Sequence, residues 1–135
     1  MSLRKNHRQL VDEAHARITT LSLTEAQAKR DEPGVVFVDI RDVRELDREG
    51  QIPDALHAPR GMLEFWVDPE SPYHRPELDP TEQELVLYCQ SGWRSALATA
   101  ALTDMGAENV SHIEGGFGAW KAADLPIGER RRPAR

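Results

Sequence analysis

The sequence has a single cysteine, Cys89, among its 135 residues. One cysteine excludes an internal disulfide and a cysteine-rich metal site, and in a reducing compartment it remains a thiol. Packing alone must therefore hold the fold together. A chain of this length is long enough for one domain with a hydrophobic core and too short for two.

Long hydrophobic runs are also lacking. No stretch approaches the ~20 apolar residues that a membrane-spanning helix requires. The 39% hydrophobic and 30% charged fractions are typical of a globular protein. The N-terminus carries no apolar stretch of signal-peptide length. We therefore expect a cytoplasmic protein without a membrane partner.

Positive charge is too scarce in the body of the chain for a nucleic-acid-binding surface. The net charge is -6, and basic residues gather in the terminal RRRPAR. Nucleic acid is therefore not an expected partner. We expect a polar N-terminal extension with a frayed helix over residues 1–17, a domain over 18–127 and a basic tail over 128–135, which we expect to be disordered and solubilising.

Predicted strands and helices alternate along the domain. Unbroken apolar and β-branched runs at 35–40 and 84–89 are typical of strands covered on both faces of a sheet. Shorter strands are predicted near residues 18–21, 55–58 and 109–113. Helices are predicted after the Ser22/Glu25 capping box, over 41–49, from Ser95 to Met105 and over 117–124. This order predicts an α/β fold with a mainly parallel sheet of about five strands and helices on both faces.

The segment between Gly61 and Pro80 contains prolines at 69, 72, 76 and 80. Neither a helix nor a strand persists for long among so many prolines. A loop of this length in a small domain is more often functional than idle. We interpret the part from 67 to 80 as one rim of a pocket, with an inert insertion as the alternative.

Cys89 lies at the carboxyl end of a predicted strand, where open α/β sheets bind ligands. The loop from Cys89 to Arg94 has Gly92 at its middle and leads into a helix near Ser95. Such a turn can direct several backbone N–H groups into one concavity, and the helix dipole and Arg94 add positive potential. All three effects favour the thiolate, so we expect a nucleophile. The alternative is an inert buried thiol.

Four segments resemble the rhodanese-like family of sulfurtransferases. CQSGWRS resembles the C-x-x-G-x-R-[ST] active loop of that family. VVFVDIRDVRE, GQIPDALHAPRG and EGGFGAWKAADLPI resemble three further motifs of the family and occur in its order. The resemblance runs from about Ile18 to Ile127 and implies the rhodanese-like fold.

The resemblance also implies a reaction. Cys89 would take a sulfane sulfur from a donor such as thiosulfate, hold it as a persulfide and pass it to an acceptor such as cyanide, a small thiol or a protein thiol. No metal or organic cofactor is needed. The residues expected to bind the substrate are those of the loop together with one arginine beyond the short strand: Gln90, Ser91, Gly92, Trp93, Arg94, Ser95 and Arg60.

The roles of several side chains near the loop are each open to two interpretations. Asp39 and Arg41 match the family's D-x-R pattern and are expected to support the loop. Whether Arg94 contacts the substrate or pairs with Asp39 stays open. Arg60 attracts an anionic donor or is a solvated surface residue, and Trp93 either borders the pocket and a partner or packs on a neighbouring helix.

We expect no catalytic or metal-binding role for the remaining polar candidates, which are the five histidines and Asp54. The five histidines show no metal-ligand spacing, so we expect structural or surface roles for them and no metal site. Asp54 stands where the family often has glycine, and an aspartate tolerates the left-handed conformation that this turn needs.

Two other functions remain as alternatives. One is a non-catalytic or sulfur-carrier module that binds another protein, although the presence of Cys89 favours catalysis. The other is a phosphatase or arsenate reductase. Related phosphatases place five residues between the cysteine and the arginine, whereas this loop has four, from Gln90 to Trp93.

Overall fold

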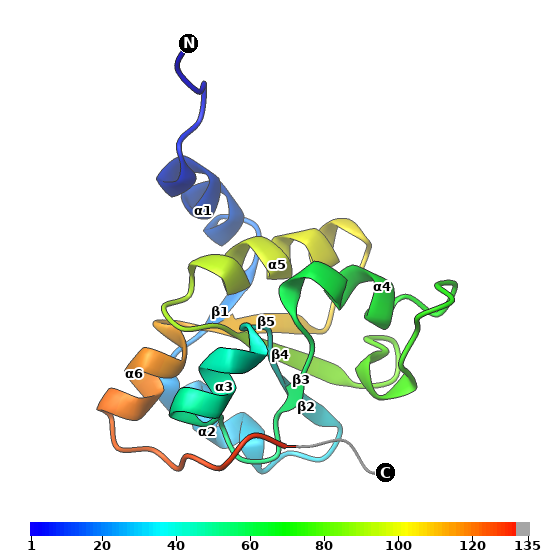
Figure 1. Ribbon diagram of the computed structural model, residues 1–135. Helices are drawn as coiled ribbons and strands as arrows, with labels where there is room; N and C mark the ends of the chain where they lie inside the picture. The colour runs from blue at the N-terminus through cyan, green and yellow to red at the C-terminus, as the bar shows by residue number, and fades with distance from the viewer. Residues whose placement is uncertain (132–135) are drawn as a thin grey trace.

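Five parallel strands form one sheet in the computed structural model, which describes residues 1–131. Residues 132–135, the end of the predicted basic tail, lie outside the described residues. The strand order is β1-β5-β4-β2-β3 (Figure 1). The strands are β1 (Thr19–Leu21), β2 (Val35–Asp39), β3 (Leu56–His57), β4 (Glu84–Tyr88) and β5 (Val110–Ile113). The predicted parallel α/β sheet is confirmed.

Helices cover both faces of this sheet (Figure 1). One face carries α4 (Leu63–Val67) and α5 (Trp93–Asp104), and the other carries α2 (Leu23–Arg30), α3 (Val43–Glu49) and α6 (Gly116–Ala122). The proline-rich segment between Gly61 and Pro80 contains two short 3-10 turns, one at its start and one near its end. They are η1 (Arg60–Met62) and η2 (Pro76–Leu78). The capping box predicted from Ser22 and Glu25 starts α2. Within residues 1–131, no helix is long and apolar enough to cross a bilayer.

The central strands are mostly apolar because their later residues are buried on both faces. Successive side chains of a strand point to opposite faces. Val38 and Leu87 therefore join the cluster beneath α4 and α5, while Phe37 and Tyr88 join the cluster that contains Trp120 of α6. This arrangement places the carboxyl ends of β2 and β4 side by side in the middle of the sheet.

The N-terminal helix α1 (His7–His15) packs on the outside of α5 (Figure 1). Asn6 caps it through a capping box. Val11 and Ala14 of α1 are buried against Ala96 and Ala100 of α5. The helix that the sequence suggested would fray is therefore held by a small apolar contact and a side-chain cap.

The first residues of the predicted basic tail are also attached. Gln51 and Gly128 exchange two backbone hydrogen bonds, of 2.9 and 2.8 Å. The Arg131 amide donates to Gln51 Oε1 at 3.0 Å. Gly128 and Arg131 are thus hydrogen-bonded to the segment after α3, a contact that the sequence did not predict.

Candidate active site

Cys89 directly follows β4, the strand that lies between β5 and β2. The residue is 1% exposed. It belongs to the apolar cluster that includes Ala58, Leu63 and Leu87. The thiol therefore lies at the carboxyl ends of the strands, as expected. It is buried beneath the loop that follows Cys89 and is not open to solvent.

Backbone amides of the loop converge on the sulfur. The Gly92 amide donates to Cys89 Sγ at 3.1 Å, and the Ser95 amide donates at 3.3 Å. The Ser95 hydroxyl lies 3.5 Å from the same sulfur. Gly92 has a φ of 99°, a left-handed conformation that glycine adopts without a steric penalty. Two amide hydrogens are thus placed to stabilise negative charge on Sγ, and Ser95 Oγ accepts from the thiol.

The start of α6 holds the carbonyl groups of the loop away from the sulfur. The Phe117 amide donates to the Cys89 carbonyl at 2.8 Å, and the Gly118 amide donates to the Gln90 carbonyl at 2.9 Å. A Cβ added at Gly116 would lie 2.4 Å from the Cys89 carbonyl oxygen. The absence of a side chain at Gly116 therefore lets α6 approach the loop closely.

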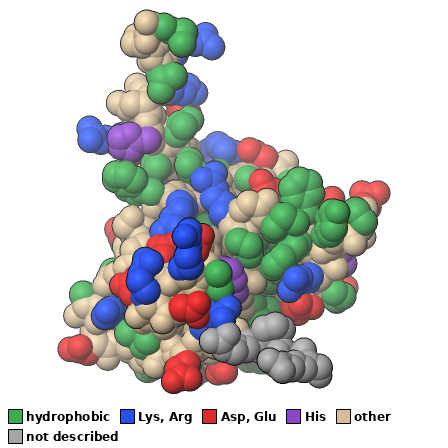
Figure 2. Space-filling model, in the orientation of Figure 1, with side chains coloured by type: hydrophobic (Ala, Val, Ile, Leu, Met, Phe, Trp, Pro, Cys, Tyr) green, Lys and Arg blue, Asp and Glu red, His purple; other side chains and the backbone are tan. Residues whose placement is uncertain are grey.

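Arg94 pairs with Glu45 of α3 and not with Asp39. Its two terminal nitrogens donate to the Glu45 carboxylate at 2.8 and 3.0 Å. These hydrogen bonds lower the pKa of Glu45 and raise the pKa of Arg94. Figure 2 shows acidic and basic side chains intermixed over α3 and the start of α5. The arginine charge beside the loop is therefore balanced.

Asp39 and Arg41 form an ion pair inside the protein, with both side chains 0% exposed. Arg41 Nη2 donates to Asp39 Oδ2 at 2.7 Å and to the Gly50 carbonyl at 2.8 Å. Arg41 Nη1 donates to Gln90 Oε1 at 3.1 Å. The guanidinium also lies 4.3 Å from the centre of the Phe117 ring. The D-x-R pair thus contacts the loop through the side chain of Gln90.

The remaining candidates lie at the surface. Ser91 and Arg60 are exposed. Trp93 is 54% exposed, and its ring lies 5.1 Å from that of His7 in α1. Trp93 therefore packs partly on a neighbouring helix and still presents most of one side to solvent. Asp54 has a φ of 67°, the left-handed conformation expected at that turn.

Sequence reasoning missed the role of a buried histidine in β5. His112 Nδ1 lies 2.9 Å from Ser95 Oγ, and His112 Nε2 lies 3.1 Å from Thr20 Oγ1. Burial lowers the pKa of His112 to about 4. No local sequence signal links it to Ser95, because the contact arises only when β5 pairs with β4.

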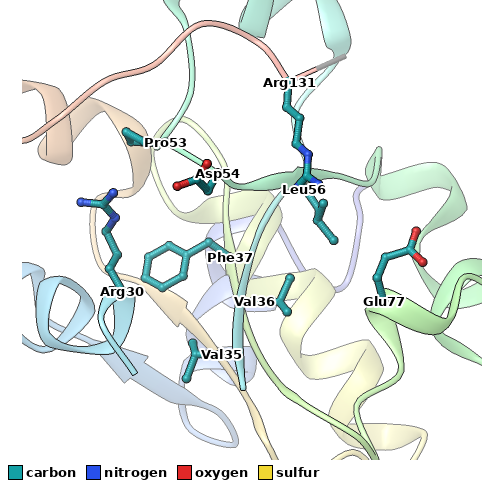
Figure 3. Close-up of a pocket in the computed structure, with 9 residues that line it drawn as sticks. All are labelled: Arg30, Val35, Val36, Phe37, Pro53, Asp54, Leu56, Glu77 and Arg131. Carbon is teal, nitrogen blue, oxygen red and sulfur yellow. The ribbon is translucent and has the colours of Figure 1, made fainter. Parts of the chain in front are cut away.

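Several hollows of the described residues lie away from Cys89. One of about 500 Å³, shown in Figure 3, adjoins the first half of β2, with Asp54 and Arg131 at its wall. Another of about 380 Å³ lies between the C-terminal end of α5 and residues such as Pro69 and Pro80. This part of the proline-rich segment therefore adjoins the end of α5 opposite the Cys89 loop. Among the described residues, no group of three or more His, Cys, Asp or Glu side chains is placed to hold a metal ion.

A family comparison agrees with this geometry. The model of the Rhodanese-like domain matches residues 22–123. The chain belongs to the rhodanese-like family. A relative from Allochromatium vinosum, named "Sulfurtransferase", is 36% identical over 102 residues, which cover 76% of this chain and 86% of that protein.

Two solved structures are also similar to this chain. A Rhodopseudomonas palustris protein of unknown function, described as a possible tyrosine phosphatase, is 46% identical with a TM-score of 0.88, covering 95% of this chain and 98% of its own. The polysulfide-sulfur transferase homodimer of Wolinella succinogenes is 30% identical with a TM-score of 0.68, covering 89% of this chain and 85% of its own. Relatives named as sulfur transferases support a rhodanese-type sulfurtransferase role for this member of the family.

Proposed function

We propose that this protein transfers sulfane sulfur through a persulfide on Cys89. The observation that carries the proposal is the convergence of the Gly92 and Ser95 amides, as hydrogen-bond donors, on one sulfur. These donors favour the thiolate, which is the nucleophilic form of cysteine. The site also lies at the N-terminal end of α5, where the helix dipole favours an anion.

The reaction has two displacements. The Cys89 thiolate attacks the sulfane sulfur of a donor such as thiosulfate, the S–S bond of the donor breaks, and sulfite leaves with the electron pair. An acceptor nucleophile, cyanide or a thiolate, then attacks the terminal sulfur of the persulfide. Cys89 leaves as a thiolate and is ready for the next donor. The cycle requires no metal or organic cofactor.

The loop residues have distinct roles in this proposal. The Trp93 and Arg94 amides lie in the first turn of α5, where an amide has no acceptor within the helix. They bind the terminal sulfur of the persulfide. Gln90, held by Arg41, fixes the start of the loop. Exposed Ser91 and Arg60 meet the incoming donor, and Trp93 borders the approach of a protein acceptor.

The length of the loop distinguishes sulfur transfer from phosphate chemistry. Four residues separate Cys89 from Arg94, one fewer than in related phosphatases. Arg94 is also occupied by Glu45, so its charge is balanced before any oxyanion arrives. Both features suit a single sulfur atom better than a tetrahedral phosphate dianion. A reducing, cytoplasmic setting suits a reaction that must regenerate a thiol in every cycle.

The decisive experiment treats the native protein with thiosulfate and measures its intact mass with and without a reductant. We expect a gain of one sulfur atom that the reductant removes, and thiocyanate formation when cyanide is added. Cys89→Ser abolishes both results, whereas Ser2→Ala, at an exposed position outside the loop, retains the mass gain.

The same experiment tests the buried position of Cys89. A native protein that takes up no sulfur from thiosulfate or polysulfide contradicts the proposal and favours a module that only binds a partner. Hydrolysis of p-nitrophenyl phosphate that depends on Cys89, without sulfur uptake, favours the phosphatase alternative.

A further inference from the structure

A continuous chain of hydrogen-bonding side chains leads from Cys89 to the edge of the sheet. Cys89 Sγ lies 3.5 Å from Ser95 Oγ, which lies 2.9 Å from His112 Nδ1. His112 Nε2 lies 3.1 Å from Thr20 Oγ1. Thr20 belongs to β1, the outermost strand on this side of the sheet, and is half-buried. The chain therefore connects the interior with a residue that reaches solvent.

The inner members of this chain are closed off from water. Cys89 and His112 are each 1% exposed, and Ser95 is 0% exposed. A thiol in this position still has to lose its proton before it becomes a nucleophile. A direct exchange of that proton with bulk water needs access that these exposures do not provide. Groups that both donate and accept hydrogen bonds offer the alternative path.

His112 is suited to such a path because it stays neutral. Burial is the main cause of its lowered pKa, and His15 of α1, stacked on it with ring centres 5.3 Å apart, adds to the effect. A neutral imidazole has one N–H and one nitrogen that accepts. It can therefore receive a proton at Nδ1 while it releases another from Nε2, without gaining a net charge.

We propose that Ser95, His112 and Thr20 relay the proton of Cys89 to solvent. The proposal rests on the role of Cys89 as the sulfur-carrying nucleophile. In the thiol state, the thiol donates to Ser95 Oγ, the Ser95 hydroxyl donates to His112 Nδ1, and His112 Nε2–H donates to Thr20 Oγ1.

Ionisation reverses every hydrogen bond of the relay. The thiol proton moves to Ser95, the Ser95 proton moves to Nδ1, the Nε2 proton moves to Thr20, and one proton leaves Thr20 for water. The hydroxyl of Thr20 then donates to Nε2, Nδ1–H donates to Ser95, and Ser95 donates to the thiolate. One proton has left the protein, and one negative charge remains on the sulfur.

The other charged groups around Cys89 do not belong to the relay. Arg94 is paired with Glu45, and Arg41 with Asp39. His15 stacks on the His112 ring, whereas the two ring nitrogens form their hydrogen bonds with Ser95 and Thr20. These groups set the electrostatic potential at the sulfur, and variants that leave them intact isolate the relay.

The first test measures the rate at which iodoacetamide alkylates native Cys89 across a range of pH. His112→Phe keeps a ring but removes both nitrogens, and we expect an alkylation rate about tenfold lower on the acidic limb, with the profile moved to higher pH. Thr20→Val lowers the rate by about threefold. Thr19→Val, at the exposed neighbouring position of the same strand, leaves it unchanged. Equal profiles for wild type and His112→Phe overturn the proposal.

A second measurement uses the unmodified protein, so it remains decisive if His112→Phe does not fold. Nitrogen-15 spectra of the histidine side chains report which ring nitrogen carries the proton. We expect His112 to change from Nε2–H to Nδ1–H as Cys89 ionises, and one unchanged tautomer overturns the relay. Neither measurement needs a sulfur donor. A protein that shows the tautomer change but takes up no sulfur therefore contradicts only the proposed function.

Discussion

Glu45 and Arg94 join α3 to the first turn of α5 through two hydrogen bonds of 2.8 and 3.0 Å. Glu45 also accepts the Asp42 amide at 3.0 Å, so the carboxylate is fixed from both sides. The positive charge of Arg94, at the end of the Cys89 loop, is thereby neutralised by Glu45, which lies 49 positions away in the sequence. The anion-stabilising capacity of the loop then depends mainly on backbone amides and the helix end.

Glu45→Gln should make the site more attractive to a dianionic donor. The amide can still accept the Asp42 hydrogen bond, but it no longer neutralises Arg94. We expect kcat/KM for thiosulfate to rise about threefold to tenfold at low ionic strength, and less at high salt. Steady-state kinetics at two salt concentrations measure this. Asp42→Asn, which alters the exposed pair with Arg44, is the control, and an equal gain in both variants contradicts the explanation.

Asp39→Asn should destabilise the protein strongly. The substitution leaves the Arg41 guanidinium buried without its counter-charge, and breaking a buried ion pair on one side costs about 3–5 kcal/mol. Urea unfolding followed by circular dichroism gives the change in the free energy of unfolding. Arg44→Gln breaks an ion pair at the surface and should leave the unfolding midpoint unchanged. A small effect of Asp39→Asn would show that water or a rearranged Gln90 compensates for the lost charge.

Gly116→Ala should disrupt the contact between α6 and the loop. Its Cβ would lie 2.4 Å from the Cys89 carbonyl oxygen and 2.9 Å from the Gln90 carbonyl oxygen. Gly34→Ala is the matched control, because Gly34 also has a positive φ but has no atom within 4 Å of an added Cβ. We expect Gly116→Ala to cost about 2 kcal/mol more than Gly34→Ala in thermal or urea unfolding. It should also lower sulfur uptake by Cys89, whereas Gly34→Ala should not.

Acid should weaken the fold through His112. Its pKa of about 4 in the folded protein lies below the ordinary 6.5, so the unfolded chain takes up a proton first as the pH falls. Stability is unaffected by this group above about pH 6.5 and declines down to about pH 4, by up to about 3 kcal/mol. Urea unfolding at a series of pH values measures the decline. His112→Asn removes this part of the pH dependence, and His7→Asn, an exposed position, retains it.

The strands and the Cys89 loop could be predicted because the sequence patterns that indicate them are local. The apolar run before Asp39, the run before Cys89 and the capping box at Ser22 each lie within a few residues of the feature that they predict. Position at the end of a strand then indicated where Cys89 would lie in the sheet. This is why the fold and the position of Cys89 at the end of β4 followed from the sequence.

Contacts between distant segments could not be predicted in this way. Glu45 and Arg94 are 49 residues apart, and Ser95 and His112 are 17 apart. Each pair forms only after the order of the strands and the faces of the helices are fixed. Cys89 also shares its buried apolar cluster with Leu63, which comes from the segment between Gly61 and Pro80. Local sequence patterns therefore predict which side chains lie near the site, whereas tertiary packing determines their hydrogen-bond partners.

The pairing of Gln51 with Gly128 ties the end of the described chain to the interior. Gly50, the neighbour of Gln51, gives its carbonyl to Arg41, and Arg41 holds Gln90. A truncation ahead of Gly128, or a bulky fusion that pulls this segment loose, would remove this support from the Cys89 loop. Affinity tags and reporter fusions for work on this enzyme therefore belong at the other terminus, where residues 1–5 project away from the body (Figure 1).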